Sequence, residues 1–362
     1  MSGSKKLPDI ERLSKTVVRV LGQNPGPYTL QGKRRFISLL QCMSLLNCNT
    51  GTNTYLVGEH NPYILVDTGE GRELYPVLLR DALLDPTSTT HADQPHISDI
   101  ILTHKHHDHT LGLPSVVSIL RQLWEERHNS DGPPYQPPRI HKFPLHTPYA
   151  KLQTVVDMLK AMPGTYVPDP SGNVFHELSH GQTFPVTTSA ADKSSSVLEV
   201  LHTPGHTADS ICLYYPVEES LFTGDTILGH GSAIFEELGP YMGTLQKLVD
   251  FSDNGLKFGP VHPGHGPYVE EGYRQVKMYL QHRVAREQQI LRRLETSPPT
   301  GHESWTTWAL VSKIYAEFPR ELWESAASSV DLHLRKLETE GRVECLGGDG
   351  KHTEWELAPG GD

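Results

Sequence analysis

Residues 97–109 read Ile-Ser-Asp-Ile-Ile-Leu-Thr-His-Lys-His-His-Asp-His. The first six are mostly apolar and β-branched, so they predict a buried strand, Ile97–Leu102. The residues after it have the spacing His-x-His-x-Asp-His on a loop that follows a strand end. Such a loop can direct several imidazoles and a carboxylate toward one point, and Zn²⁺ accepts both kinds of donor. We therefore predict a metal site here rather than a solvated histidine-rich loop.

Three further motifs carry potential donors between turn residues. They are Thr203-Pro204-Gly205-His206-Thr207, Thr223-Gly224-Asp225-Thr226 and His262-Pro263-Gly264-His265-Gly266-Pro267. The first two follow the predicted strands Val197–His202 and Leu221–Thr223, and glycine or proline sets the turn in all three. They strengthen the prediction of a metal site built from strand ends.

Strands and helices alternate along the first two-thirds of the chain. Strands are predicted at Tyr55–Val57, Tyr63–Val66, Ile97–Leu102, Val197–His202, Ile211–Tyr215 and Leu221–Thr223. Helical spacing of apolar residues appears within 76–84, 116–123 and 245–251. This order indicates a layered α/β domain. The proline-rich stretch Asn129–Pro148 is predicted to be a surface connection.

A second, smaller unit is predicted at the C-terminal end. A long helix over Glu270–Thr296 ends at Ser-Pro-Pro-Thr-Gly, which cannot continue it, so we place the domains at residues 1–296 and 302–362. Two amphipathic helices and a hairpin follow, an order that resembles a winged helix. Residues 283–362 contain ten basic and fourteen acidic side chains, which disfavours binding to duplex DNA. Packing against the large domain, or homodimer formation, is the favoured role.

Composition limits the partners and the compartment. The chain has 32 basic and 43 acidic residues and a net charge of -11, so a broad surface for long nucleic acids is not expected. The four cysteines are irregularly spaced, which suits a reducing compartment. No membrane-spanning or clear targeting segment is recognised. We expect a cytoplasmic or mitochondrial-matrix protein with no membrane partner.

With Leu65-Val66-Asp67-Thr68-Gly69 as the first of five ordered motifs, the sequence resembles the metallo-β-lactamase superfamily. Within it, the chain is most similar to the β-lactamase-like protein 2 group. That similarity rests on residues 19–27 (Arg-Val-Leu-Gly-Gln-Asn-Pro-Gly-Pro), Thr29-Leu30-Gln31-Gly32, the strand at 52–58 and the winged-helix-like tail. The resemblance implies an α/β fold, the metallo-β-lactamase αββα sandwich, with a C-terminal winged-helix-like module.

The resemblance also implies a site that binds two zinc ions per chain. It assigns His104, His106 and His206 to one ion, Asp108, His109 and His265 to the other, and Asp225 to both. Asp108 and Asp225 are accordingly the predicted catalytic residues. Asp67 is expected to support the metal loop without binding an ion. Of the remaining histidines, His107 is expected to face solvent, and His230 is expected to be an exposed loop residue, with a place lining the cleft as the alternative.

Two activities are consistent with the resemblance. The first is a zinc-dependent hydrolase that cleaves single-stranded RNA internally, as the β-lactamase-like protein 2 group implies. The second keeps the same site but hydrolyses an acyl thioester, as in fungal lactamase-like enzymes that release polyketides from acyl carrier proteins. A scaffold without catalysis is disfavoured, because all seven donors are present.

One segment departs from the family pattern. The group runs Thr-Leu-Gln-Gly directly into Thr-Asn-Thr-Tyr, whereas nineteen residues, 33–51, intervene here. Deleting them restores the family loop without a gap, so we interpret the segment as a retained in-frame intron or a gene-model error. A real surface insertion near the cleft entrance is the alternative. Sequencing the transcript across this junction separates the two.

Overall fold

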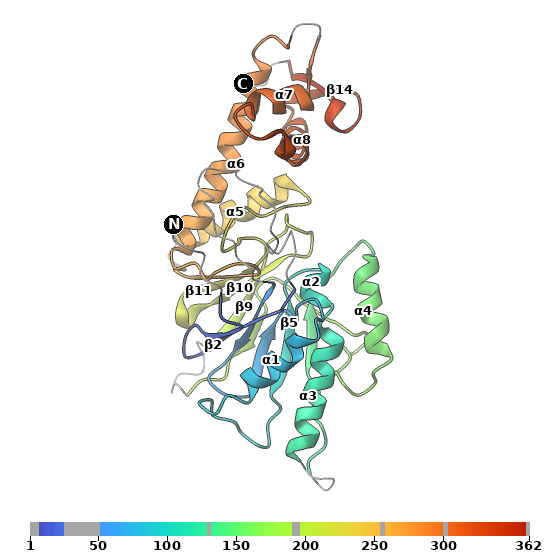
Figure 1. Ribbon diagram of the computed structural model, residues 1–362, viewed down its shortest axis with the longest axis vertical. Helices are drawn as coiled ribbons and strands as arrows, with labels where there is room; N and C mark the ends of the chain where they lie inside the picture. The colour runs from blue at the N-terminus through green and yellow to red at the C-terminus, as the bar shows by residue number, and fades with distance from the viewer. Residues whose placement is uncertain are drawn as a thin grey trace.

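The computed structural model describes residues 7–24, 51–128, 132–189, 196–253, 258–299 and 303–359. The segment at 33–51 therefore lies outside the described residues, except for Gly51. Two sheets face each other between layers of helices, and a small module stands at one end of the molecule (Figure 1). None of the helices in the described ranges combines the length and apolar character needed to span a bilayer.

The first sheet has seven strands that pair in chain order. They are β1 (Ile10–Arg12), β2 (Val17–Leu21), β3 (Asn53–Val57), β4 (Tyr63–Val66), β5 (Ile97–Leu102), β6 (Arg139–Lys142) and β7 (His176–Glu177). The first four are antiparallel, and β4 to β7 are parallel. Its outer face is covered by α1 (Leu74–Leu83), α3 (Leu113–Arg127) and α4 (Ala150–Lys160).

The second sheet has five strands in the order β12, β11, β10, β9, β8. They are β8 (Thr183–Pro185), β9 (Val197–His202), β10 (Ile211–Tyr215), β11 (Ser220–Gly224) and β12 (Val261–Pro263). Two helices, α5 (Leu238–Asp253) and α6 (Gly272–Leu294), cover its outer face. The layers therefore follow the order helix, sheet, sheet, helix.

Strand β10 shows why the sheets stack in this way. Ile211, Leu213 and Tyr215 pack between the two sheets, whereas Cys212 and Tyr214 face the helices. All five side chains are buried, because successive residues of a strand point to opposite faces and both faces are covered here. The sequence of this strand is therefore a continuous apolar run rather than an alternation of apolar and polar residues.

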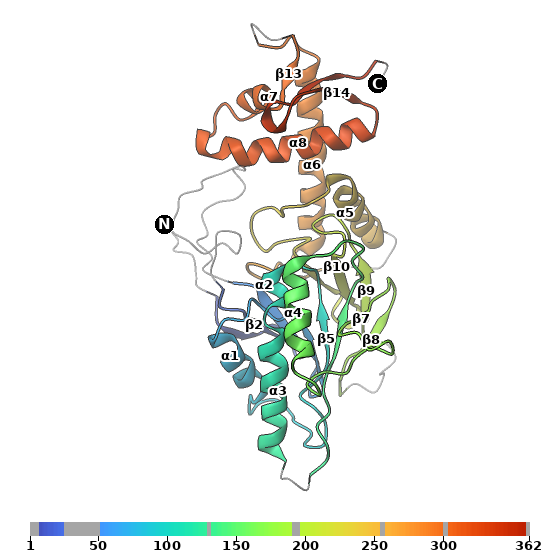
Figure 2. The same cartoon turned by 90° about the vertical axis from the view of Figure 1, so that its right-hand side faces the viewer.

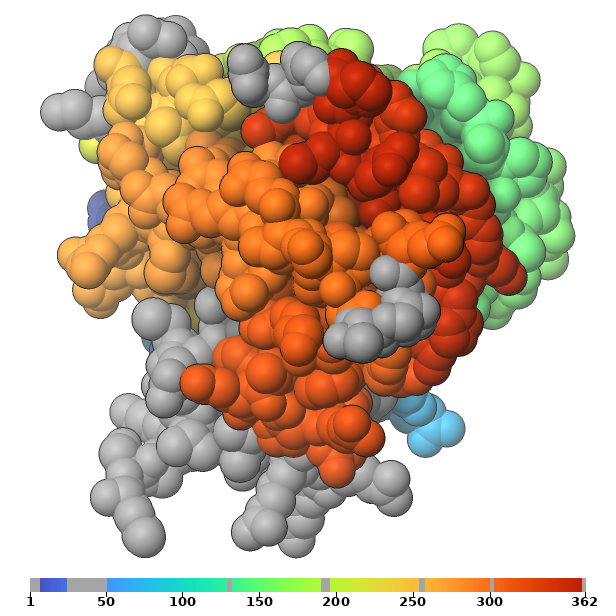
Figure 3. Space-filling view, turned by 90° about the horizontal axis from the view of Figure 1, so that it is seen from above, coloured from blue at the N-terminus to red at the C-terminus, as the bar shows by residue number. Residues whose placement is uncertain are grey.

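The end module is a winged helix built on a helix of the main domain. It contains β13 (Trp305–Thr306), α7 (Thr307–Ile314), α8 (Trp323–Thr339), β14 (Val343–Gly347) and β15 (Glu354–Leu357). Val330, Leu334 and Leu337 of α8 are fully buried in its core, together with Ile290 and Leu294 of α6. Helix α8 crosses α6 beyond the sandwich (Figure 2), and the module fills much of the view from that end (Figure 3). The predicted αββα sandwich with a winged-helix module is confirmed.

One expectation was wrong. The stretch Asn129–Pro148 contains β6, which lies in the first sheet rather than in a surface connection. The sequence pattern did not indicate this strand, because it has a single aliphatic residue and buries two polar ones. His141 contacts Asp99 at 2.8 Å, and the Lys142 ammonium pairs with Asp209. These partners lie far away in the sequence, so local composition could not reveal that the polar side chains were compatible with burial.

Candidate metal centre

All seven predicted donors follow the carboxyl ends of strands. His104 and His106 come after β5, and Asp108 and His109 lie in the one-turn helix α2 (His107–Thr110). The other three donors, His206, Asp225 and His265, follow β9, β11 and β12. Since β5 belongs to one sheet and the other strands to the second sheet, the site lies where the two sheets meet at one edge of the sandwich.

The structure brings the seven donors into two adjoining groups. One group contains His104, His106, His206 and Asp225, and the other contains Asp108, His109 and His265; the donor atoms of each group lie within 4.8 Å of one another. Asp225 links the two groups. Its Oδ2 is 3.7 Å from His206 Nε2 and 3.3 Å from His265 Nε2, and its Oδ1 is 3.4 Å from His109 Nε2.

Hydrogen bonds fix the direction in which three of the imidazoles present their nitrogens. His206 Nδ1 donates to the carbonyl of Ile234 at 2.7 Å, and His109 Nδ1 donates to Asp67 Oδ2 at 2.7 Å. His104 Nδ1 lies 3.0 Å from the Thr103 hydroxyl, which donates its own proton to Asp67. The Nε2 atoms of these rings are therefore directed at the common centre, where each can bind an ion once it carries no proton.

Asp67 supports the loop that carries the histidine motif at 104–109. Its backbone has φ +58°, an uncommon conformation for a residue with a side chain. The carboxylate accepts hydrogen bonds from the backbone N–H and the hydroxyl of Thr103, both at 2.8 Å, and from His109. It thus holds both ends of the histidine motif and belongs to neither donor group, in keeping with its expected supporting role.

The arrangement fits a cation. His106 Nδ1 lies 3.0 Å from His104 Nε2 and also 3.0 Å from His206 Nε2. One proton can serve only one of these two contacts, whereas a cation among the three nitrogens satisfies all of them. Asp225 Oδ1 is shielded from solvent and accepts no hydrogen bond from the described residues. Imidazole and carboxylate donors of this kind suit Zn²⁺.

The charges of the two groups are set by burial and by their neighbours. Burial lowers the pKa of His106 to about 4, and His206 beside it adds to the effect, so this ring is neutral. Burial opposes the charge of His265, but Asp225 and Asp108 raise its pKa to about 9. Burial likewise opposes ionisation of Asp225, yet His265 and His109 hold its pKa well below its usual range. The carboxylates are thus ionised and available as ligands, whereas His265 would have to release its proton to bind an ion.

Gly264 allows the two groups to approach each other. A Cβ at this position would collide with Asp225 Oδ1 and would lie 2.9 Å from His109 Cε1. Its N–H donates to the carbonyl of Gly224 at 2.7 Å, which fixes the turn before His265 beside the turn before Asp225. Only a residue without a side chain fits between the two loops.

The other histidines that the structure describes lie outside both groups. His107 is about one-third exposed and contacts Glu70 at 3.3 Å. His202 stacks on Phe143, and His262 is buried against Phe222. His230 lies against Gly266, and its ring nitrogens are shielded from solvent without a hydrogen-bond partner among the described residues.

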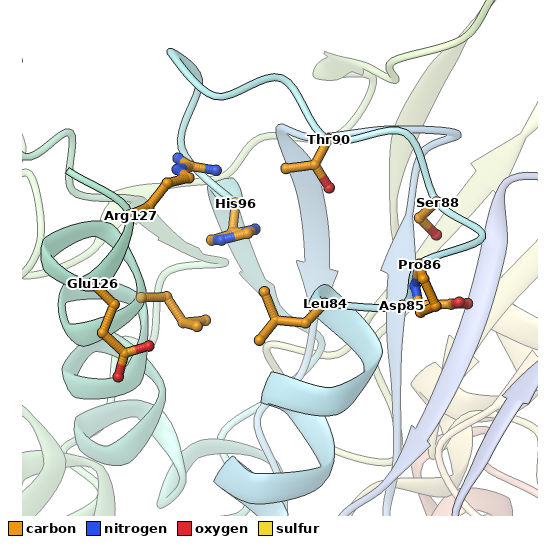
Figure 4. Close-up of a pocket in the computed structure, with 9 residues that line it drawn as sticks. Leu84, Asp85, Pro86, Ser88, Thr90, His96, Glu126 and Arg127 are labelled. Carbon is orange, nitrogen blue, oxygen red and sulfur yellow. The ribbon is translucent and has the colours of Figure 1, made fainter.

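A cavity of about 370 Å³ lies elsewhere in the molecule. Its lining residues include Leu84, which follows α1, His96, which precedes β5, and Leu123 and Arg127 of α3 (Figure 4). The histidine motif at 104–109 follows the opposite end of β5, about 20 Å away for six residues of strand. None of the seven donors lines this cavity.

The sequence alone did not point to two residues beside the donors, Lys142 and Asp209. Both are almost completely buried and pair with each other, and Asp209 also accepts a hydrogen bond from the Thr207 hydroxyl at 2.8 Å. Asp209 lies three residues after His206, so its position next to the motif was a usable signal. Lys142 gave none, because its strand was not predicted.

The sandwich and the histidine and aspartate donors at its edge describe a protein that could hold metal ions, and comparison with known proteins identifies its family. Residues 49–310 match the metallo-beta-lactamase superfamily, and residues 306–355 match the beta-lactamase associated winged helix domain. The chain belongs to the metallo-beta-lactamase superfamily. Members of this superfamily are generally hydrolases, and their fold typically binds metal ions.

Named relatives cover nearly the whole chain. A beta-lactamase-like protein 2 homolog from Drosophila melanogaster is 35% identical over 343 residues, which are 93% of this chain and 92% of the relative. An atrochrysone carboxyl ACP thioesterase from Passalora fulva is 29% identical over 95% of this chain and 81% of its own length. Among solved structures, a beta-lactamase domain protein from Burkholderia ambifaria has a TM-score of 0.61 at 15% identity, covering 96% of this chain and 93% of that one. The last likeness concerns the fold alone.

Proposed function

We propose that this protein is a zinc-dependent endoribonuclease that binds two zinc ions and cleaves single-stranded RNA. The observation that carries the proposal is the pair of adjoining donor groups linked by Asp225, in a chain similar over nearly its full length to a beta-lactamase-like protein 2 homolog. His104, His106 and His206 would hold one ion, Asp108, His109 and His265 the other, and Asp225 would contact both. Two such ions activate water at neutral pH and stabilise the charge that develops when the phosphodiester bond breaks.

The residues beside the donors suit a short single strand. Tyr149 has its ring centroid 6.4 Å from that of His106. The Lys105 ammonium lies 5.3 Å from the Tyr149 centroid and pairs with Glu236 at 2.9 Å, so an RNA phosphate would share this cation with Glu236. Lys151 follows on α4 and lies 3.3 Å from His107. Aromatic rings with nearby cations are how proteins hold single strands without a broad basic surface. This local arrangement is compatible with a net charge of -11.

Hydrolysis of an acyl thioester is the second candidate. It is favoured by one observation, the 29% identity over 95% of the chain to the Passalora fulva protein, which is named an acyl carrier protein thioesterase. The metal donors would serve either substrate, since both reactions need an activated water and a polarised bond. The two candidates differ in the substrate that Tyr149 would contact, an RNA base in the first and an acyl group in the second.

Side-by-side turnover of a fluorogenic single-stranded RNA and an acyl thioester by the zinc-loaded protein tests the proposal. We expect RNA to be the better substrate, and Asp225→Asn to abolish its cleavage, which excludes a contaminating nuclease. Tyr149→Ala should raise the KM for RNA by about 5- to 150-fold, because a stacked base contributes about 1–3 kcal/mol. Thioester turnover far above RNA turnover would refute the ribonuclease assignment and support the second candidate.

A further inference from the structure

The loop of residues 231–236, between β11 and α5, holds one of the predicted metal ligands. The Ile234 carbonyl accepts the hydrogen bond from His206 Nδ1 at 2.7 Å. The backbone N–H of Glu236 approaches the carbonyl oxygens of Gly205 at 2.9 Å and His206 at 3.1 Å. This loop therefore fixes both the ring and the backbone of His206.

The loop is in turn held by α6. Tyr279 donates its hydroxyl proton to the Gly231 carbonyl at 2.6 Å. Arg283 Nη2 lies 3.2 Å from the Ala233 carbonyl oxygen and 3.3 Å from the Ser232 hydroxyl oxygen. The Arg283 guanidinium also lies over the Phe235 ring, 4.7 Å from its centroid. Two side chains of one helix thus contact most of the loop.

The burial of Arg283 makes these contacts important. The residue is only 5% exposed and makes no ion pair with a carboxylate among the described residues. A buried guanidinium needs compensation for its lost hydration. Here a loop carbonyl, a loop hydroxyl and an aromatic face provide it, so the position of the loop and the position of Arg283 depend on each other.

Helix α6 belongs to two cores. Val276 and Tyr279 pack in the core beside the second sheet, whereas Ile290 and Leu294 pack in the winged-helix core. Its 23 residues span about 34 Å, and Figure 1 shows it running from the sandwich into the module. Arg283 lies between the two cores, at the level where the helix meets the 231–236 loop.

We propose that Arg283 is a positioning residue for the metal centre. By holding the 231–236 loop against α6, it keeps the Ile234 carbonyl on His206 Nδ1 and the His206 Nε2 directed at the other donors. The orientation of this ligand thereby depends on the helix on which the winged-helix module is built. The inference rests on the proposed metal-dependent function, but it concerns binding of the metal and not the identity of the substrate.

The test is a titration of metal-free protein with Zn²⁺ and, separately, with Co²⁺, whose visible absorption reports the geometry of its ligands. Groups that orient a metal-bound histidine change metal affinity by about 10- to 100-fold when removed. Arg283 acts through a loop, so we expect Arg283→Met to weaken binding by about tenfold and to alter the Co²⁺ spectrum. Arg283→Lys should restore part of the affinity.

Arg286→Met is the matched control, since Arg286 is on the same helix and covers an aromatic ring, Tyr315, but contacts the winged helix instead of the loop. It should leave metal affinity within about twofold of the wild type. Tyr279→Phe, which removes one hydroxyl, provides a second variant if Arg283→Met does not fold, and it should weaken binding in the same direction. Unchanged affinity and spectrum in the Arg283 and Tyr279 variants, or an equal loss in Arg286→Met, would overturn the inference. Loss of affinity in the Arg283 variant of a protein that does not cleave RNA would sustain it while refuting the ribonuclease proposal.

Discussion

The buried ion pair between Lys142 and Asp209 provides a test of how the first sheet is joined to the β9–β10 loop, which also carries His206. Lys142 ends β6 of the first sheet, and Asp209 lies in the loop between β9 and β10 of the second sheet. The side chains are 3% and 0% exposed. Replacing Lys142 with Met leaves the Asp209 carboxylate buried with the Thr207 hydroxyl but without its cation.

The expected cost follows from that isolation. Removing one partner of a buried pair destabilises a protein by about 3–5 kcal/mol, because an uncompensated charge remains. At about 2–4 °C per kcal/mol, Lys142→Met should lower the melting temperature by about 6 °C or more. The double variant Lys142→Met with Asp209→Leu removes both charges. It should recover most of this loss, since well-packed apolar residues often replace a buried pair at little cost.

Chemical denaturation and differential scanning calorimetry of the wild type, both single variants and the double variant complete the cycle. We expect a coupling free energy of about 2 kcal/mol or more between the two positions, within the range measured for residues in contact. Additive single-variant effects, or a Lys142→Met variant within about 1 kcal/mol of the wild type, would refute the reasoning. Arg121→Met, at an exposed pair with Glu125, is the control and should leave stability nearly unchanged, because an exposed ion pair is screened by solvent.

Three further predictions concern the metal centre, pH and the module. Asp225→Ala should lose more bound zinc and more activity than His206→Ala, because Asp225 adjoins both donor groups; elemental analysis of the purified variants measures this, and two retained ions would contradict it. Burial opposes ionisation of Glu287, but His333 and Lys336 bring its pKa in the folded protein below the ordinary 4.5. The ionised carboxylate therefore contributes its full stabilisation above pH 4.5, and this contribution is lost as the pH falls through the lower pKa of the folded state. Acid titration of tryptophan fluorescence should therefore show a low-pH loosening of the module that is weaker in Glu287→Gln, and identical curves would rule out this carboxylate. Truncation after residue 296 should reduce stability and solubility, because it exposes the α6 residues of the winged-helix core. It should not abolish zinc binding, because every predicted donor precedes residue 296. Equilibrium dialysis with Zn²⁺ measures the binding, and loss of both ions would show that the module is needed to form the site.

Much of the fold was predictable in the segments whose buried residues are apolar. The predicted strands at 63–66, 97–102, 197–202 and 211–215 coincide with β4, β5, β9 and β10, and the predicted winged-helix stripe at Val330, Leu334 and Leu337 is buried. These segments are covered on one or two faces by apolar neighbours, so their composition carries the information. Strand β6 was not predicted, because its polar residues are buried against Asp99 and Asp209. These partners are distant in the sequence, so the local sequence pattern does not include them.

For the candidate site, the sequence by itself determined the donors that lie close together along the chain. His104, His106, Asp108 and His109 share one strand-to-helix loop, and their spacing limits how far apart the side chains can lie. The sequence also indicated that His206, Asp225 and His265 follow turns, and the resemblance to a family assigned them to the same site. Nothing in their spacing, 19 and 40 residues apart, required them to meet.

Only the tertiary structure decided that meeting, and the hydrogen bonds that orient the rings. Stacking the two sheets brings the end of β5 against the ends of β9, β11 and β12, because the apolar residues between the sheets can be buried only when the sheets face each other. The contacts of Arg283 with the 231–236 loop and of Lys142 with Asp209 arise from the same packing. They join segments about 50 and 67 residues apart, and a charge is tolerated at each position only because the folded chain supplies a partner there.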